Sequence, residues 1–181
     1  MNILVACEYS GIVSAAFRAK GHQVMSLDIL PTEQPGYHLQ GKLEHALSIN
    51  WDMIIAFPPC THLCIASTWR WKNDKENMSR AFALIKLIWE SPGKMICIEN
   101  PVGWLNNNWR APDQILSPHL FGSRFQKRTC FWLKNLPPLI LGCTVLNPRP
   151  LINQFGSGHN KPKLRSKFQP ELANAMSEQW G

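Results

Sequence analysis

The sequence lacks an apolar run approaching the ~20 residues that would cross a bilayer, and no basic region opens it. A membrane span and a secretory signal are therefore not expected. It also lacks a Gly-Lys-Ser/Thr phosphate loop, which disfavours a nucleoside triphosphatase. No internal repeat or low-complexity tract occurs.

The six cysteines are dispersed, and none belongs to the paired C-x-x-C of common metal sites. A secreted disulfide scaffold would be smaller and denser in cysteine, so we expect a reducing cytoplasm. Cys60-x-His62-x-Cys64 offers three soft ligands, but alternate spacing is poor for chelation. We expect no metal, and a structural zinc at this segment remains the alternative.

Composition indicates a folded domain with a positive charge. A hydrophobic content of 45% and a mean hydropathy of −0.18 are typical of a globular chain. A length of 181 residues suits one domain, predicted over 1–181 with a loop-rich basic part over 147–181. The net charge of +7 favours a polyanionic partner.

Strand-like and helix-like patterns alternate along the chain. Strands are predicted at 2–7, 22–27, 52–57, 95–98 and 129–133, and helices at 12–20, 79–90 and 170–179. Segments predicted to be irregular or loop are 32–50, 60–76 and 104–126. This alternation predicts an α/β, Rossmann-like fold with a mostly parallel sheet flanked by helices.

Residues able to bind, attack or exchange protons follow four of these strands. They are Glu8-Tyr9-Ser10-Gly11, Asp28, Pro58-Pro59-Cys60 and Glu99-Asn100. Ligands of parallel sheets gather at the carboxyl ends of strands, so we expect one shared site. Backbone N–H groups at Ser10 and Gly11, with Asp28 accepting from a ribose diol, would suit an adenosine-containing cofactor.

Cys60 and Glu99 are the candidate reactive groups. Two prolines hold Cys60 at a strand end, a position that favours a thiolate, whereas a lone cysteine is more often a small buried hydrophobe. Glu99 follows an apolar strand, where a partly buried carboxyl can exchange a proton with a substrate. The alternative for Glu99 is a loop-structuring role.

Two segments combine features suited to nucleic acid. Trp69-Arg70-Trp71-Lys72 interleaves aromatic and basic groups, which suits base stacking and phosphate contact, or else a core tryptophan beside a solvated cation. The segment 161–167 carries four cations, among them Lys163 and Arg165. It is either an arm that binds the phosphate backbone of nucleic acid or a solvated tail.

Taken in chain order, these motifs resemble the DNA cytosine-5 methyltransferases over about residues 3–133, in the form of a minimal, phage-like member. The family's Phe-x-Gly-x-Gly-Gly cofactor loop, ribose-binding acid, Pro-Cys nucleophile, Glu-Asn pair and Gln-x-Arg-x-Arg signature have counterparts here. In the same order, these are Ala6–Gly11, with Phe17 after it; Asp28; Asp52–Cys60, with Arg80 after it; Glu99-Asn100; and Gln126-Lys127-Arg128.

The resemblance implies a Rossmann-like methyltransferase fold, S-adenosylmethionine as cofactor, and nucleic acid as partner, DNA more than RNA. It implies catalytic roles for Cys60, which would add to C6 of cytosine, for Glu99 at N3, and for Arg128. Cofactor-binding roles fall to Cys7, Glu8, Ser10, Gly11, Asp28, Ile29 and Pro58. Substrate-binding roles fall to Pro59, Asn100, Trp69, Arg70, Gln126, Lys163 and Arg165.

The chain also departs from the family pattern. Glu8 and Ser10 stand at two glycine positions of the cofactor loop, Lys42 stands where an acid is usual, and Cys130 replaces the second signature arginine. Only about 30 residues lie between Asn135 and Arg165, where the family inserts a target-recognition domain. We therefore expect a methyltransferase with low sequence specificity or with specificity supplied by a protein partner. A free pyrimidine nucleotide methyltransferase and a non-catalytic nucleic-acid- or nucleoside-binding descendant remain the alternatives.

Overall fold

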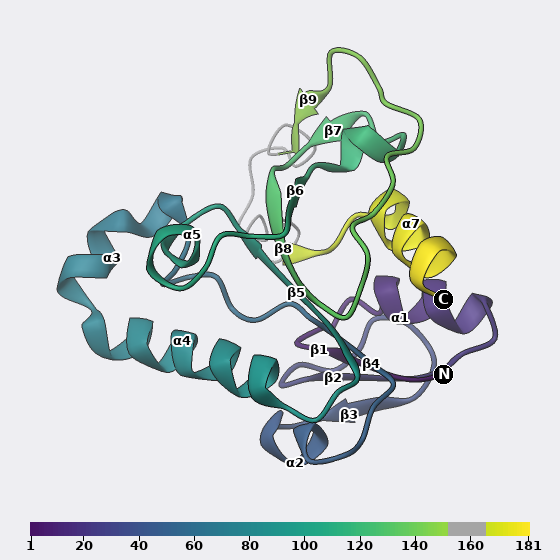
Figure 1. Cartoon of the computed structure of the whole chain (residues 1–181), viewed down its shortest axis with the longest axis horizontal. Coiled ribbons are helices and arrows are strands. Elements are labelled where there is room, and N and C mark those ends of the chain that lie inside the picture. The colour runs from purple at the N-terminus through teal and green to yellow at the C-terminus, as the bar shows by residue number, and fades with distance from the viewer. Residues whose placement is uncertain (152–165) are drawn as a thin grey trace.

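A seven-stranded sheet forms the centre of the protein (Figure 1). The computed structural model describes residues 1–151 and 166–181, apart from the side chains of Arg70 and Lys72. The strand order is β3-β2-β1-β4-β5-β8-β6, in which β8 runs antiparallel to both of its neighbours and the other pairs are parallel. The strands are β1 (Asn2–Ala6), β2 (Gln23–Asp28), β3 (His38–Gln40), β4 (Met53–Ala56), β5 (Met95–Pro101), β6 (Gln114–Leu116) and β8 (Thr129–Lys134).

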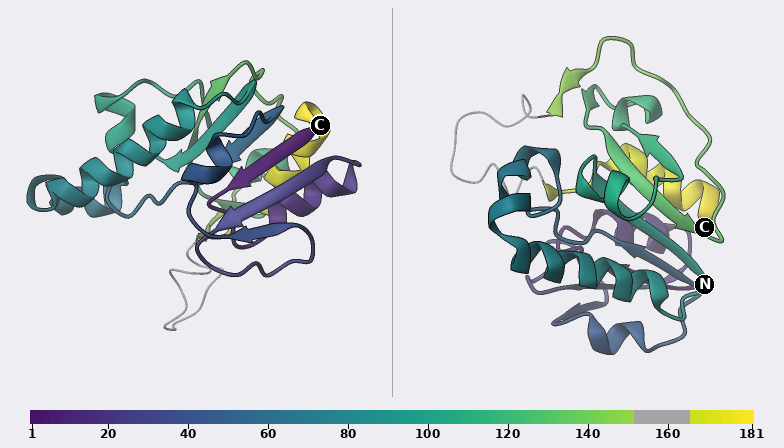
Figure 2. Two further views of the ribbon diagram at one scale, coloured as in Figure 1. Left: turned by 90° about the horizontal axis from the view of Figure 1, so that it is seen from below. Right: turned by 60° about the vertical axis from the view of Figure 1, so that its left-hand side comes forward.

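Helices cover both faces of this sheet (Figure 2). They are α1 (Ile12–Ala19), α2 (Glu44–Leu47), α3 (Thr68–Asn73), α4 (Lys75–Glu90), α5 (Trp104–Asn108) and α7 (Pro170–Trp180), with 3₁₀ turns η1 (Ile65–Ser67) and η2 (Pro118–Phe121). A small second sheet pairs β7 (Phe125–Gln126) with β9 (Arg149–Pro150). Among the helices over 1–151 and 166–181, none is both long and apolar enough to cross a lipid bilayer.

The alternation of side chains along β1 divides the apolar core into two layers. Ile3 and Val5 point to the face covered by α1 and α7, where they share a buried cluster with Phe17 of α1. Leu4 points to the opposite face, in a cluster with Ile85 of α4. Because each central strand is buried on both faces, its sequence is a continuous apolar run.

The predicted α/β, Rossmann-like fold with a mostly parallel sheet flanked by helices is confirmed. The loop predictions were wrong in part: β3 and α2 lie within 32–50, η1 and α3 within 60–76, and α5, β6, η2 and β7 within 104–126. The main helix begins at Lys75, four residues before the predicted start. These elements are mostly short, so they carry little periodic signal of their own and depend on packing against the rest of the chain.

Candidate active site

A cavity of about 560 Å³ opens where four central strands end. Cys7 enters it after β1, Asp28 from the end of β2, Cys60 from the loop after β4, and Glu99 from β5. These strands are parallel neighbours in the order β2-β1-β4-β5, so their carboxyl ends meet at one edge. The fold therefore brings residues that are far apart in sequence to a single pocket.

The candidate site residues divide into three groups. Those lining the cavity are Cys7, Asp28, Ile29, Pro58, Pro59, Cys60 and Glu99. Those that do not line it are Glu8, Ser10, Gly11, Asn100, Trp69, Gln126 and Arg128. Lys163, Arg165 and the side chain of Arg70 lie outside the described residues.

Glu8 is buried beneath the start of α1 rather than open to a ligand. Its carboxylate accepts the backbone N–H of Val13 at 2.6 Å and of Ser14 at 3.2 Å, and the Ser14 hydroxyl also donates to it. Burial raises the pKa of Glu8, and the hydrogen bonds from Ser14 and Val13 oppose that rise. The Glu8 carboxylate thus caps the start of α1 from inside and satisfies N–H groups there, and its contact with a cofactor stays a prediction.

Ser10 and Gly11 complete this turn without reaching the cavity. Ser10 is buried, and its hydroxyl lies 3.5 Å from the backbone N–H of Ile12. Gly11 precedes α1 in the left-handed region with φ 71°, a conformation that favours glycine. Both residues shape the strand-to-helix turn, whereas their neighbours Cys7 and Tyr9 line the cavity, and the cofactor contacts of Ser10 and Gly11 stay predictions.

The end of β2 provides one half of the cavity. Asp28 accepts the backbone N–H of Leu30 at 2.9 Å, which turns the chain so that Ile29 and Leu30 both line the pocket. Ile29 is 72% exposed, which leaves an apolar surface beside a carboxylate. Lys42 lines the same region. A carboxylate next to an apolar wall is the environment that a ribose and an adenine ring require.

Cys60 lies at the other half, on a loop anchored to β5. The side-chain amide of Asn100 donates to the carbonyl of Pro58 over 2.9 Å. Asn100 is buried, so it holds the Pro-Pro-Cys loop from below and does not face the cavity as a substrate contact would. A hydrogen bond to Cys64, burial and the nearby Glu99 raise the pKa of Cys60, and Lys127 opposes them.

Glu99 is buried on β5, and the hydroxyl of Thr129 on β8 donates to its carboxylate. Lys127 lies between β7 and β8 and lines the cavity. Arg128 is exposed on the other side and does not line the cavity. The cation that lines the cavity with Cys60 is therefore Lys127, and the catalytic role of Arg128 stays a prediction.

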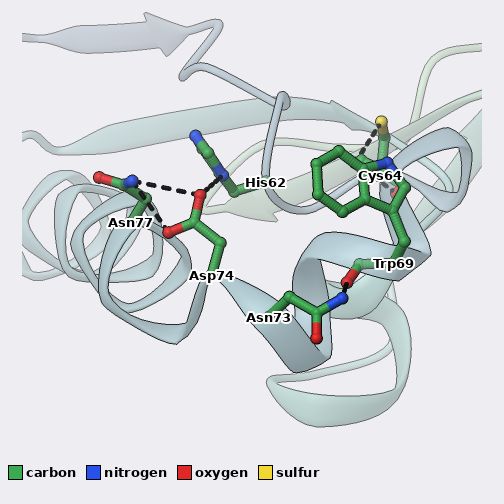
Figure 3. Close-up of polar contacts among 7 residues, drawn as sticks. His62, Cys64, Trp69, Asn73, Asp74 and Asn77 are labelled. Carbon is green, nitrogen blue, oxygen red and sulfur yellow. Dashed lines mark hydrogen bonds and ion pairs between the residues drawn. The ribbon is translucent and has the colours of Figure 1, made fainter.

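The loop after Cys60 has its own polar partners (Figure 3). His62 Nδ1 lies 3.2 Å from a carboxylate oxygen of Asp74, and the Cys64 sulfur lies 3.2 Å from the Ser67 hydroxyl oxygen. Trp69 on α3 is 60% exposed and does not line the cavity. The part of the chain that the structure describes brings no group of three or more His, Cys, Asp or Glu side chains together in a way that could hold a metal ion.

Comparison with known proteins gives a limited result. No protein-family model and no curated protein matches the chain. A mutant of Spodoptera frugiperda DNMT2, solved by crystallography, is similar over 82% of this chain and 57% of that one, with 17% sequence identity and a TM-score of 0.49. The chain thus spans a little over half the length of that structure.

Proposed function

We propose that the chain transfers a methyl group from S-adenosylmethionine to carbon 5 of a pyrimidine base, through a covalent adduct on Cys60. The observation that carries this proposal is that one cavity is lined by the thiol of Cys60, the carboxyl of Glu99 and the carboxyl of Asp28. A nucleophile and a proton-exchanging group on one side, with a ribose-binding acid on the other, suit a two-substrate transfer.

The donor would lie along the Asp28 half of the cavity. Asp28 accepts hydrogen bonds from the ribose diol, and Ile29 and Leu30 cover the adenine ring. Glu8 already engages the first-turn N–H groups of α1, so the amino-acid part of the donor needs other polar partners. Tyr9 and Ser166, whose hydroxyl oxygens lie 3.0 Å apart at the cavity, provide them. When bound, S-adenosylmethionine supplies an electrophilic methyl group.

The residues at the other half would activate the base. The Cys60 thiol loses its proton to water and its sulfur forms a bond to C6, the C5=C6 π electrons move to the C4–C5 bond, and the C4=N3 electrons move to N3, which takes a proton from Glu99. Carbon 5 is then nucleophilic: it would form a bond to the donor methyl carbon as the bond from that carbon to the sulfonium sulfur breaks, which releases S-adenosylhomocysteine, and N3 returns its proton to Glu99. Loss of the C5 proton to water would then restore the C5=C6 bond and break the bond from C6 to the sulfur of Cys60. Lys127 stabilises negative charge on the ring and on the thiolate.

The base would belong to nucleic acid, DNA more than RNA. The net charge of +7 supports a polyanionic partner, and a base in a duplex must leave the stack to reach Cys60. A target-recognition segment of the usual length does not fit between Asn135 and Arg165. We therefore propose weak sequence preference, or a protein partner that supplies it.

A trapping assay tests the proposal. DNA containing 5-fluorocytosine cannot lose a C5 proton, so with donor present it should leave a covalent adduct that is absent in Cys60→Ser. Incorporation of a tritiated methyl group into duplex DNA, single-stranded DNA, RNA and dCTP, measured side by side, identifies the substrate. Labelling of dCTP alone would mean that the substrate is a free pyrimidine nucleotide and not nucleic acid. Absence of donor binding in calorimetry would overturn both and leave a binding protein.

A further inference from the structure

The excess positive charge of the protein is confined to one stretch of the sequence. Residues 114–170 contain nine lysine and arginine residues and no aspartate or glutamate. The rest of the chain holds ten basic and twelve acidic residues, which is a net charge of −2. Such an asymmetry marks the basic stretch as the part of the protein that a polyanion would contact.

Within this stretch, three arginines gather at the small sheet formed by β7 and β9. The backbone N–H of Arg149 on β9 donates to the carbonyl of Arg124 over 2.9 Å, and Arg128 follows two residues after β7 ends. Figure 1 shows this small sheet beyond β6 and β8, at the opposite end of the molecule from β3 and α2. Arg124, Arg128 and Arg149 are called the arginine surface below.

The side chains of the arginine surface are open to solvent. Arg124, Arg128 and Arg149 are all exposed. Phe125 and Lys127, which lie between the first two arginines, are half-buried, so inward and outward positions alternate along this segment. In the part of the chain that the structure describes, none of the three arginines forms an ion pair with a carboxylate. Their charges are therefore not neutralised by a neighbouring acid.

The fold holds this surface in place before any ligand binds. The backbone N–H of Gly142 donates to the carbonyl of Leu120 at 3.1 Å, and the N–H of Val145 donates to the carbonyl of His119 at 2.8 Å. These bonds tie the chain that leads to β9 onto η2, just before β7. Because the surface is already formed, a ligand does not have to order it first.

The arginine surface adjoins the cavity through Lys127. Lys127 precedes Arg128 in the chain and lines the cavity together with Cys60. Its backbone N–H donates to the hydroxyl of Ser117 at 3.0 Å, and Ser117 is buried, so this bond fixes the segment between β7 and β8. A strand of nucleic acid lying on the arginine surface is thus directly beside the cavity.

We propose that the arginine surface binds the sugar–phosphate backbone of the nucleic acid whose base enters the cavity. The inference rests on the proposed function for the base, whereas the charge and geometry of the surface do not depend on methyl transfer. Guanidinium groups pair with phosphate oxygens through two parallel N–H donors. Phosphate contacts position a strand without reading its sequence. The surface therefore orients nucleic acid with little sequence preference, as the short interval between Asn135 and Arg165 requires.

The salt dependence of DNA binding tests the inference without S-adenosylmethionine. Fluorescence anisotropy of labelled duplex DNA gives the association constant between about 50 and 250 mM NaCl. Arg124→Ala and Arg149→Ala should each make the slope of its logarithm against the logarithm of salt concentration less steep by about 0.9, the effect of one lost phosphate contact. Both should weaken the binding of unrelated sequences equally. Lys86→Ala removes the same charge from an exposed position on α4 and should keep the wild-type slope.

Several results would overturn the inference. One is a slope in Arg124→Ala and Arg149→Ala that equals the slope in Lys86→Ala, and another is wild-type binding that does not depend on salt. A loss of affinity confined to one DNA sequence would mean that the arginines read bases. Equal affinity for polyglutamate and for DNA would assign the surface to an acidic protein. By contrast, failure of the trapping assay with the expected slopes would refute methyl transfer and leave the arginine surface intact.

Discussion

The side-chain amide of Asn100 donates to the carbonyl of Pro58 over 2.9 Å, and this bond joins the end of β5 to the loop that carries Cys60. The two residues are 42 positions apart in sequence. Neither an amide nor a prolyl carbonyl has reactive chemistry of its own. Their bond nevertheless helps to decide where Cys60 lies relative to Glu99, the residue before Asn100.

Replacing Asn100 with alanine should therefore disturb both stability and reactivity. Removing the donor leaves the buried carbonyl of Pro58 without this partner, which we expect to lower the free energy of unfolding by about 1–3 kcal/mol. Urea unfolding measures this loss, and alkylation of Cys60 reports whether the loop has moved. Asn107→Ala, at an exposed position on α5, is the matched control and should change stability by less than about 0.5 kcal/mol.

Gly103 is predicted to tolerate no side chain. A Cβ atom there would lie 2.1 Å from the carbonyl oxygen of Leu63 and 2.8 Å from the Cα of Cys64, both backbone atoms that cannot easily move. Gly103→Ala should cost about 1–3 kcal/mol by overpacking and displace the turn that holds Cys60. Gly41→Ala has nothing within 4 Å of the added atom and should retain wild-type stability. Equal melting temperatures for the two variants would contradict the close approach at Gly103.

Glu8→Gln should change how stability depends on pH. Burial raises the pKa of Glu8 above its ordinary value of 4.5, so folding favours the protonated form. The associated stability is present below pH 4.5 and is lost as the pH rises through the raised pKa. Urea unfolding from pH 4 to 8 should thus show wild type losing stability relative to Glu8→Gln. The opposite trend would mean that the N–H groups of Val13 and Ser14 outweigh burial.

Lys127 and Arg128 offer a direct contrast between adjacent cations. Lys127→Ala removes the positive charge that lowers the pKa of Cys60 and should slow formation of the 5-fluorocytosine adduct by about tenfold, the effect of roughly one pKa unit. Arg128→Ala, on the exposed side, should change the rate by less than about threefold, through weaker phosphate contact alone. A larger loss in Arg128→Ala than in Lys127→Ala would support the catalytic role predicted for Arg128 and contradict the role of Lys127.

Much of the fold follows from local patterns. The apolar runs at β1, β2, β4 and β5 predict buried parallel strands because such strands are covered on both faces. The polar residues that follow these strands predict one shared site, because the carboxyl ends of parallel neighbours meet at one edge of the sheet. By contrast, β3 is three residues long, and α2 only four. Elements of this size form only against a surface that the rest of the chain provides.

The sequence by itself determined how strands and helices follow one another along the chain around β1, β4 and β5, because each element has its own local periodicity of apolar residues. It also determined which residue types stand at the carboxyl ends of these strands. The tertiary structure alone decided that β8 is antiparallel, that Lys127 and not Arg128 faces Cys60, and that Glu8 caps α1 from inside. The direction in which each of these side chains points is set by pairing and burial against residues distant in the chain, which no local pattern records.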